Sequence, residues 1–357
     1  MQNHPGVVVG MSGGVDSSVA AALLVEQGYS VTGIMLRLWS DDANNCENSC
    51  CTPEAVNQAR KVAAQLGIPF YVLDTQEVFK KKVVEYFLSD LKKGLTPNPC
   101  IVCNRSIRWG YLMDQMSNFN ADYFATGHYA RTSAGENGLV RLYKGHDPQK
   151  DQSYVLSGLN QNQLSHTIFP LGELKKEEVR EKARQFGFEI ADKKDSQDLC
   201  FIGQDGLEGF LSRQDNSLLQ PGDIIDTSGK ILGQHQGLAR YTIGQRKGLR
   251  ISSPQPYYVI DKDTSTNQVI AGFSEELGKS ELTAADVNWI DGAAPEAPFQ
   301  ASVKIRYKAE LAEGFVFPLG YDKFNVTFKE PLRDITAGQR VVLYSEDYCL
   351  GGGTIQK

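Results

Sequence analysis

Short apolar runs alternate with longer amphipathic segments through the first 130 residues of the chain. An apolar run of four to nine residues predicts a buried strand, and an apolar stripe at a period of 3.6 predicts a helix. The predicted strands cover 6–11, 31–39, 69–74 and 122–130, and the predicted helices cover 17–28, 53–67 and 77–94. Gly28, Gly67 and Gly94 stand where these helices should end. Alternating strands and helices are typical of a parallel sheet with helices on its faces, so this part is predicted to be α/β.

The pattern changes near Ile190, after a last amphipathic segment at 175–188. Glycine-rich turns and short strands follow, including two strands around a polar turn at 256–273. From about Leu282 the strands follow one another at a spacing that favours a small barrel or sandwich. We therefore expect three domains. They are a nucleotide-binding α/β domain at 1–205, a small β-rich central domain at 206–275 and a C-terminal β-barrel at 276–357.

Length and composition agree with a folded chain of several domains. A chain of 357 residues exceeds what one hydrophobic core usually serves. No run of about 18 apolar residues is present, and the amino terminus lacks a basic region followed by a cleavable apolar segment. The sequence therefore predicts a cytoplasmic protein without a membrane segment. The seven cysteines are odd in number and unevenly spread. In a reducing cytosol they are expected to be catalytic, metal-binding or buried.

The net charge of −6 argues against a protein that coats nucleic acid nonspecifically. Two stretches, 234–251 and 303–308, are nevertheless locally basic. Each is compatible with an ordinary solvated surface or with a local RNA-binding face.

The segment GMSGGVDSS at 10–18 carries the clearest chemical signal, because it joins a predicted strand to a predicted helix. The small residues Ser12, Gly13 and Gly14 let backbone N–H groups approach an anion, and the helix presents its positive end to that anion. No lysine follows as it does in GxxxxGK[ST]. A phosphate loop without this lysine suits cleavage between the α and β phosphates of ATP. The segment resembles the PP-loop of the ATP pyrophosphatases, which implies ATP binding and a role for Asp16 in holding Mg²⁺.

Two cysteines lie in segments that suit thiol chemistry. Cys103 belongs to LTPNPCIVCNRSIRW, where Pro97 and Pro99 form a turn that opens a helix. A helix dipole at that position lowers a thiol pKa. Cys200 lies in ADKKDSQDLCFIG, a polar loop between the first two domains. Either cysteine alone could equally be a buried, inert thiol.

Taken together, these segments resemble one family over practically the whole chain. TPNPxxxCN, DSxxxCFIG, GMSGGVDSSVAA, GHYAR at 127–131, KDQSYVL at 150–156 and CLGGG at 349–353 are similar to the tRNA-specific 2-thiouridylases, the MnmA/TrmU family. The resemblance implies an adenine nucleotide alpha hydrolase-like PP-loop domain and a central domain that contacts tRNA. It also implies ATP-dependent 2-thiolation of uridine 34 in lysine, glutamate and glutamine tRNAs.

The resemblance also implies residue roles. Cys200 would carry a persulfide from a sulfur donor or relay protein, and would deliver sulfur after ATP has adenylated O2 of the uridine, with release of AMP and pyrophosphate. Cys103 would attack the persulfide, freeing hydrosulfide or closing a transient disulfide bond with Cys200. The implied nucleotide-binding residues are Gly10, Met11, Ser12, Gly13, Gly14, Val15, Asp16, Ser17, Met35 and Gly127. The implied tRNA-binding residues are Asn98, Pro99, Cys100, His128, Lys150, Asp151, Gln152, Arg306, Tyr307 and Gln339.

Cys100 departs from the family pattern, because many members have an aspartate three residues before the first catalytic cysteine. A thiol could replace it as a proton shuttle, or water could. Thiolates at 50, 51, 100 and 103 could bind zinc, and Cys100, Cys103 and Cys200 could hold an iron–sulfur cluster. The sequence leaves these metal sites open, and we predict no resident metal at the site.

Three other functions fit parts of the pattern. They are another PP-loop enzyme such as an amidotransferase or lysidine synthetase, a 4-thiouridine enzyme, and a noncatalytic RNA-binding module. The paired cysteines weigh against the first and the similarity of the terminal barrel against the second. The intact phosphate loop together with both cysteines weighs against the third.

Overall fold

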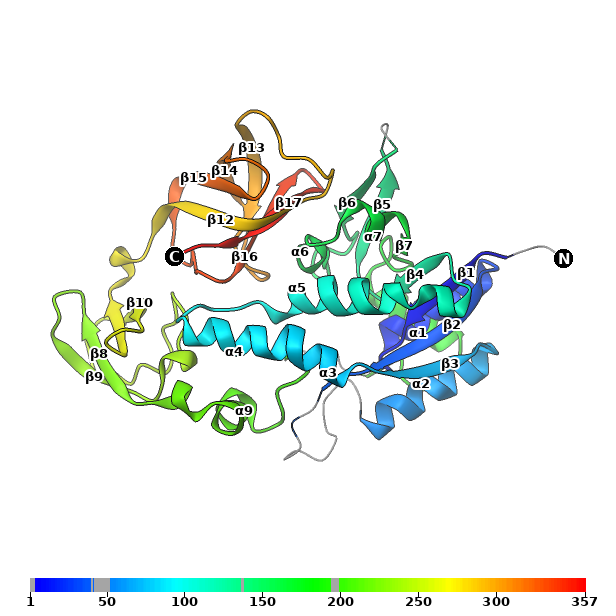
Figure 1. The fold of residues 1–357 in the computed structure, drawn as a ribbon, viewed down its shortest axis with the longest axis horizontal. Helices are drawn as coiled ribbons and strands as arrows, with labels where there is room; N and C mark the ends of the chain where they lie inside the picture. Colours follow the sequence, from blue (N-terminus) through cyan, green and yellow to red (C-terminus); the bar gives the residue numbers. More distant parts are fainter. Residues whose placement is uncertain (1–3, 40, 42–51, 136–137, 194–198) are drawn as a thin grey trace.

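The computed structural model describes residues 4–39, 41, 52–135, 138–193 and 199–357. It confirms the predicted class, which is a parallel-sheet α/β domain followed by a small β-rich domain and a C-terminal β-barrel (Figure 1). Within these ranges, no helix has the length and apolar character needed to cross a membrane.

The N-terminal sheet has the order β3-β2-β1-β4-β7, and all of its pairings are parallel. Its strands are β1 (Gly6–Gly10), β2 (Ser30–Arg37), β3 (Phe70–Asp74), β4 (Tyr123–Thr126) and β7 (Thr167–Ile168). The helices that pack on it include α1 (Val15–Glu26), α2 (Pro53–Leu66) and α8 (Lys176–Gln185). Val7, Val8 and Val9 of the central strand β1 are buried. Because β1 and β4 are parallel neighbours, their carboxyl ends meet at one edge of the sheet. Open α/β sheets bind ligands at this edge.

The bounds of α2 follow from its sequence. Thr52 caps the helix with its Oγ1, which accepts a hydrogen bond from the Ala55 N–H at 3.0 Å, and Pro53 occupies the first helical position. Gly67 ends the helix with a left-handed φ of 67°. The predicted helix 53–67 is thus confirmed to within one residue.

A helical arm leads from the sheet to the other domains. It consists of α3 (Gln76–Phe79), the π-helix η2 (Lys80–Val84), α4 (Glu85–Lys92), α5 (Pro99–Cys103) and the π-helix η3 (Asn104–Leu112). The arm passes beneath the barrel, and α5 packs against η2 within it (Figure 1). Cys103 lies where α5 passes into η3, and π-helical turns are frequent at functional sites.

The remaining short elements connect these parts. They are η4 (Met116–Phe119), β5 (Ala130–Ala134), β6 (Val140–Lys144), α6 (Ser153–Leu156), α7 (Gln161–Ser165), α9 (Gly206–Gln214), η5 (Asn216–Leu219), η6 (Leu238–Arg240) and η7 (Ser274–Glu276).

The central domain is a sheet of order β10-β11-β8-β9. Its strands are β8 (Gly222–Asp226), β9 (Ile231–His235), β10 (Tyr258–Asp263) and β11 (Gln268–Gly272). Ile224, Val259 and Val269 form its small core. The strand pair predicted at 256–273 is the antiparallel hairpin β10–β11.

The C-terminal strands follow the order β12-β15-β14-β13-β16-β17, and a further β12–β17 pairing closes them into a six-stranded barrel. They are β12 (Lys279–Trp289), β13 (Phe299–Lys304), β14 (Ala312–Pro318), β15 (Lys323–Leu332), β16 (Arg340–Ser345) and β17 (Tyr348–Ile355). Of the two folds the sequence favoured, the barrel is therefore the one present. The β5–β6 hairpin of the N-terminal part extends this sheet through β6–β17 pairing, which fixes the barrel against the first domain.

Candidate active site

The loop after β1 is folded tightly around the start of α1. Gly13 has a φ of 71°, and a Cβ there would lie 2.4 Å from the Ala55 carbonyl oxygen. The Ser12 N–H donates to Ser17 Oγ at 3.2 Å, and Ser17 Oγ donates to the Gly14 carbonyl at 3.1 Å. A glycine is therefore required at position 13, and the loop is held in place at the amino end of α1, where an anion is stabilised.

The end of β4 closes this loop from the other side. A Cβ on Gly127 would lie 2.7 Å from the Ser17 nitrogen and from the Asp16 carbonyl carbon. Only glycine lets the β4 end approach the first turn of α1 so closely. The predicted nucleotide-binding residues Asp16, Ser17 and Gly127 are therefore neighbours.

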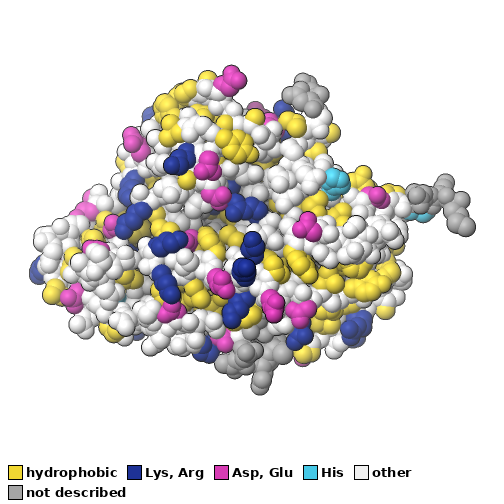
Figure 2. Space-filling view, in the orientation of Figure 1, with side chains coloured by type: hydrophobic (Ala, Val, Ile, Leu, Met, Phe, Trp, Pro, Cys, Tyr) yellow, Lys and Arg dark blue, Asp and Glu magenta, His cyan; other side chains and the backbone are white. Residues whose placement is uncertain are grey.

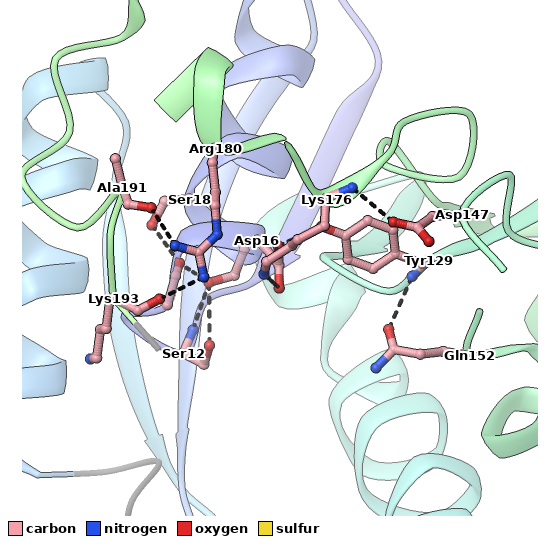
Figure 3. Close-up of polar contacts among 12 residues, drawn as sticks. Ser12, Asp16, Ser18, Tyr129, Asp147, Gln152, Lys176, Arg180, Ala191 and Lys193 are labelled. Atoms are coloured by element: carbon pink, nitrogen blue, oxygen red, sulfur yellow. Dashed lines mark hydrogen bonds and ion pairs between the residues drawn. The ribbon is translucent and has the colours of Figure 1, made fainter. Parts of the chain in front are cut away.

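Asp16 is held by groups that come from two distant parts of the chain (Figure 3). The Lys176 ammonium at the start of α8 lies 2.8 Å from each carboxylate oxygen, and the Tyr129 hydroxyl donates to Oδ1 at 2.7 Å. The Lys176 side chain is 9% exposed, whereas that of Asp16 is 30% exposed. Nearby, the Lys193 ammonium donates to the Gly13 carbonyl at 3.2 Å. Two cations therefore flank the phosphate loop.

A pocket of about 210 Å³ opens beside this loop. Its lining residues are Gly10, Met11, Ser12, Asp16, Ser17, Ile34, Met35, Leu36, Leu38, Cys103, Arg108, Leu112, Phe124, Thr126, Gly127, His128 and Gln152. One wall is apolar and comes largely from β2, and the opposite wall carries the polar groups of the loop. This arrangement suits an adenine ring on one side and phosphates on the other. Met35 is fully buried in β2, so it forms part of the sheet core as well as of the pocket wall.

The structure places Gly13, Gly14 and Val15 outside the pocket lining, in the tight turn itself. Gly14 is the N-cap of α1, and the Val15 side chain is buried. These three residues shape the loop, whereas Gly10, Met11 and Ser12 face the cavity.

Cys103 joins the phosphate loop in this pocket, although its side chain is only 7% exposed. It also belongs to an apolar cluster built by α3 to η3 and by the chain from Leu199 to α9. Cys200 packs against the same cluster and is half-buried. The two predicted catalytic thiols therefore contact the same apolar cluster, although 97 positions separate them.

Phe201 anchors Cys200 to this cluster. Its ring lies 5.4 Å from that of Phe87, 5.5 Å from that of Phe210 and 5.9 Å from that of Phe79. Such edge-to-face contacts add to the free energy of burying the ring. The position of Cys200 therefore depends on Phe201.

Phe201→Ala is expected to lower the free energy of unfolding by about 3–5 kcal/mol, because it leaves a cavity among three aromatic rings. Denaturant unfolding would measure this loss. Phe273→Ala is the control, because Phe273 stacks on Tyr257 outside the cluster. A loss no larger than that of Phe273→Ala would contradict the anchoring role.

His128 is buried between Arg108 and Thr126. Arg108 Nη1 donates to His128 Nε2 at 3.1 Å, so the imidazole proton lies on Nδ1, which contacts Thr126 Oγ1 at 2.7 Å. Burial, followed by the charge of Arg108, holds the pKa of His128 well below its ordinary value. His128 is therefore a neutral group on the pocket wall.

Replacing His128 by Gln is expected to flatten the dependence of stability on pH. The unfolded chain binds a proton at this residue near pH ~6.5 that the folded protein does not bind. Below that pH, protonation of His128 in the unfolded chain therefore lowers the free energy of unfolding by about 1.4 kcal/mol for each pH unit. Above that pH the loss is absent. Denaturant unfolding at several pH values between 5 and 8 would measure the slope. Gln149→Ala, at an exposed position without a titratable side chain, should keep the wild-type slope. An unchanged slope in His128→Gln would refute this assignment.

Several residues predicted to bind tRNA surround the 96–99 loop. Asn98, Pro99 and Cys100 open α5, and Cys100 is exposed. Gln339 of the barrel holds the loop from outside, because its Nε2 donates to the Thr96 carbonyl at 3.0 Å. The barrel therefore sets the position of the segment that leads into Cys103.

Three more of the predicted tRNA-binding residues, at 150–152, lie in the segment between β6 and α6. Gln152 lines the pocket and accepts a hydrogen bond from the Tyr129 N–H at 3.0 Å. The Asp151 carboxylate is buried and accepts hydrogen bonds from the Gly145 and Ser153 N–H groups. Asp151 thus organises the backbone around it, while its neighbour Lys150 is half-buried.

The two barrel residues among them are also engaged within the protein. The Tyr307 hydroxyl donates to the Asp151 carbonyl at 3.3 Å, and Arg306 pairs with Asp334 at 2.5 Å. Burial is the main cause of the raised pKa of Tyr307. The structure shows what these two residues contact within the protein, and their contact with tRNA stays a prediction.

The remaining cysteines differ in setting. Burial raises the pKa of Cys349 to about 12, so this thiol is protonated and unreactive at neutral pH. Cys46, Cys50 and Cys51 lie outside the described residues, and with them the four-thiolate zinc site. Across the described ranges, no three His, Cys, Asp or Glu side chains are grouped so that they could hold a metal ion.

Sequence reasoning missed Arg108, Thr126, Lys176 and Lys193. Arg108 lies five positions after Cys103 in a segment that was already singled out, so its place on the helix could have drawn attention to it. Lys176 carries no such local signal, because it lies 160 positions from its partner Asp16 in an ordinary charged helix.

The chain resembles known proteins over nearly its whole length. Family models match residues 5–204 (tRNA methyl transferase HUP domain), 208–272 (tRNA methyl transferase PRC-barrel domain) and 279–355 (aminomethyltransferase beta-barrel domain). The chain is 46% identical to the tRNA-specific 2-thiouridylase MnmA of Symbiobacterium thermophilum, over 98% of this chain and 92% of that protein. It is also 46% identical to that of Carboxydothermus hydrogenoformans, over 98% and 97%. A 4-thiouridine synthetase solved with RNA and ATP is 20% identical, over 53% of this chain and 43% of that chain, with a TM-score of 0.36.

Proposed function

The chain belongs to the tRNA-specific 2-thiouridylase family, and from this membership we propose that it thiolates C2 of uridine 34 in lysine, glutamate and glutamine tRNAs at the expense of ATP. One observation carries the proposal. The pocket that contains the phosphate loop also contains Cys103, and Cys200 packs against the cluster to which Cys103 belongs. Adenylation and sulfur transfer can therefore act on one base.

The first step activates the oxygen that sulfur replaces. O2 of the uridine bonds to the α-phosphorus of ATP, the bond from that phosphorus to the bridging oxygen breaks, and pyrophosphate leaves. The amino end of α1 and the small residues of the loop stabilise the phosphate charge. Without this step the oxygen would be a poor leaving group.

The second step transfers sulfur. The terminal sulfur of a Cys200 persulfide attacks C2, and the C2–O bond to AMP breaks. Cys103 attacks the Cys200 sulfur, which cleaves the persulfide bond and leaves a Cys103–Cys200 disulfide. If this attack comes first, it frees hydrosulfide, which then attacks C2. In either order an external dithiol must reduce the disulfide, and a persulfide donor or relay protein must reload Cys200.

Asp16 fits a role in holding Mg²⁺ with the phosphates. Among the described residues that line the pocket it supplies the carboxylate, and Mg²⁺ is commonly held by one or two carboxylates together with substrate phosphates. Its contacts to Tyr129 and Lys176 use three of the roughly four lone-pair positions of a carboxylate. One position is left for a hard cation, which would offset phosphate charge.

The predicted tRNA contacts and domain limits belong to the same proposal. Cys100 and the residues around the 96–99 loop would receive the target base, and the barrel residues Arg306, Tyr307 and Gln339 would hold the anticodon arm. We propose the domain limits 1–205, 206–275 and 276–357, and a cytoplasmic location for the reaction.

The test is direct. Purified protein is incubated with ATP, Mg²⁺, a persulfide donor, a dithiol and each unmodified tRNA, and 2-thiouridine and AMP are quantified by mass spectrometry. We expect one AMP for each 2-thiouridine, in tRNAs with a uridine at position 34 and not in a variant with cytidine there. AMP formation without a thiolated base, aerobically and after anaerobic iron reconstitution, would show that the reaction has been misassigned.

A further inference from the structure

A second pocket, of about 260 Å³, lies between the helical arm and the C-terminal barrel. Its lining residues are Lys82, Tyr86, Asn98, Ile101, Val102, Arg105, Ser106, Asp286, Gly338, Arg340 and Thr354. Of the residues expected in the active site, only Asn98 contributes to it. It borders the 96–99 loop and the outer side of α5, the helix that ends in Cys103.

The charges that line this pocket do not balance. Lys82, Arg105 and Arg340 supply three cations, and Asp286 is the single carboxylate among the lining residues. Asp286 is shared, because it lies 3.1 Å from Arg105 and 3.8 Å from Arg340. Lys82 is exposed and forms no ion pair with any residue that the structure describes. The lining therefore has an excess of positive charge.

Arg340 shows most clearly that a partner is missing. Its side chain is 4% exposed, and its Nη atoms donate to the Asp286 and Gly352 carbonyls, while Nε has no partner. A buried guanidinium group with an unpartnered donor is costly, and a nearby negative charge offsets part of that cost. Burial and the charge of Arg105 both lower the pKa of Arg340, to about 10. A negatively charged group bound in the pocket would stabilise the charged form of Arg340 and raise this pKa again.

The backbone at Asp286 is arranged for this charge cluster. Asp286 has a left-handed φ of 50° within β12, at the irregularity where β12 pairing with β17 shifts between Ala285 and Asn288. Asp adopts this conformation more readily than most non-glycine residues. The Asp286 carboxylate lies beside the guanidinium groups of Arg105 and Arg340.

Lys and Arg side chains also gather in a band on this face of the molecule, which runs down from the barrel across the region of α4 and α5 (Figure 2). Such a track suits a polyanion. We propose that the pocket binds a backbone phosphate of the RNA substrate, next to the target nucleotide. The inference rests on the proposed function, and it adds a phosphate site that positions the RNA. Lys82 and Arg105 pair with the phosphate oxygens, Ser106 donates to them, and the buried charge of Arg340 attracts them.

The test compares Lys82→Gln with Lys81→Gln, because Lys81 is an adjacent exposed lysine that does not line the pocket. The dissociation constant for unmodified tRNA is measured from 50 to 300 mM KCl. Lys82→Gln should weaken binding and lower the slope of log affinity against log salt by about 0.7–0.9, the value for one lost phosphate contact. Lys81→Gln should have a smaller effect. Equal slopes for the two variants would overturn the proposal.

Ser106→Asp provides a second test, because it puts a carboxylate where the phosphate would bind. It should weaken tRNA binding more than Lys82→Gln does, while Ser89→Asp, on an exposed position of α4 outside the pocket, should not. ATP affinity of all variants should match that of the wild type, which reports that the fold is intact. Equal tRNA affinity of Ser106→Asp and Ser89→Asp would contradict the phosphate site.

Three further outcomes are decisive. If inorganic phosphate binds the wild type in a Lys82-dependent manner while tRNA affinity ignores Lys82, the pocket takes a free anion and the RNA assignment fails. If the wild type binds no tRNA at all, the proposed function fails and this inference fails with it. If the wild type binds and thiolates tRNA while the pocket variants behave as their controls do, the phosphate site alone is wrong.

Discussion

Cys200→Ser is expected to lower the rate of tRNA thiolation by about a thousandfold or more, because a serine hydroxyl cannot form a persulfide. Cys103→Ser should lose a similar factor with a persulfide donor. The loss should lie in sulfur transfer, since neither substitution alters the phosphate loop. The measurement is single-turnover formation of 2-thiouridine, with AMP followed in parallel.

Cys349→Ala is the matched control for these two substitutions. It removes a thiol whose pKa burial raises to about 12, so thiolation should stay near the wild-type rate. Substantial persulfide-dependent turnover in Cys103→Ser would contradict the two-thiol mechanism. Free sulfide should restore part of the activity of either serine variant, because sulfide can attack the adenylated base without a carrier thiol.

Cys100 has a separate test, because the resemblance to the 2-thiouridylases implies an aspartate at this position. If its thiol transfers a proton, Cys100→Ser should lower the thiolation rate and Cys100→Asp should restore it with a shifted pH profile. If Cys100 only lines the base-binding loop, both variants should keep the wild-type profile. Its exposure leaves room for either substitution.

Much of the fold could be predicted because its signals are local. The apolar run at 6–11 and the small residues at 12–14 specify a strand and a turn within a few positions, and β1 and α1 confirm this prediction. The caps at Thr52 and Gly67 likewise fix α2. The strand spacing after Leu282 indicated either a barrel or a sandwich. The sequence could not decide whether the sheet closes into a barrel, because closure depends on the β12–β17 pairing between the two ends of the domain.

The features that the sequence did not reveal depend on long-range contacts. The β5–β6 hairpin joins the barrel through pairing of Tyr143 with Tyr348, and no local pattern specifies that pairing. The second pocket combines Lys82 with Arg340 from separate domains. The π-helical form of 104–112 depends on hydrogen bonds that apolar periodicity does not distinguish from an α-helix. The Asp16–Lys176 pair is the largest omission at the active site itself.

Lys176→Met is expected to lower kcat/KM for ATP by about a hundredfold. The reason is that Asp16 is no longer held in place; Lys176 itself is not a reacting group. The ammonium contacts both carboxylate oxygens at 2.8 Å, so its removal leaves Asp16 free to turn away from the phosphates. Unfolding free energy should fall by about 1–3 kcal/mol, because the partly buried Asp16 carboxylate loses its charged hydrogen-bond donor. Steady-state kinetics and denaturant unfolding measure the two effects, and Lys175→Met, on the exposed neighbour, should change neither.

A double-mutant cycle separates the two roles of this pair. Asp16→Asn removes the carboxylate charge that Lys176 neutralises, so adding Asp16→Asn to Lys176→Met should recover most of the lost stability. It should not recover the rate, because the carboxylate proposed to hold Mg²⁺ is then absent. Recovery of both would mean that the pair only stabilises the fold. A Lys176→Met enzyme as fast as Lys175→Met would show that Asp16 keeps its position through Tyr129 alone.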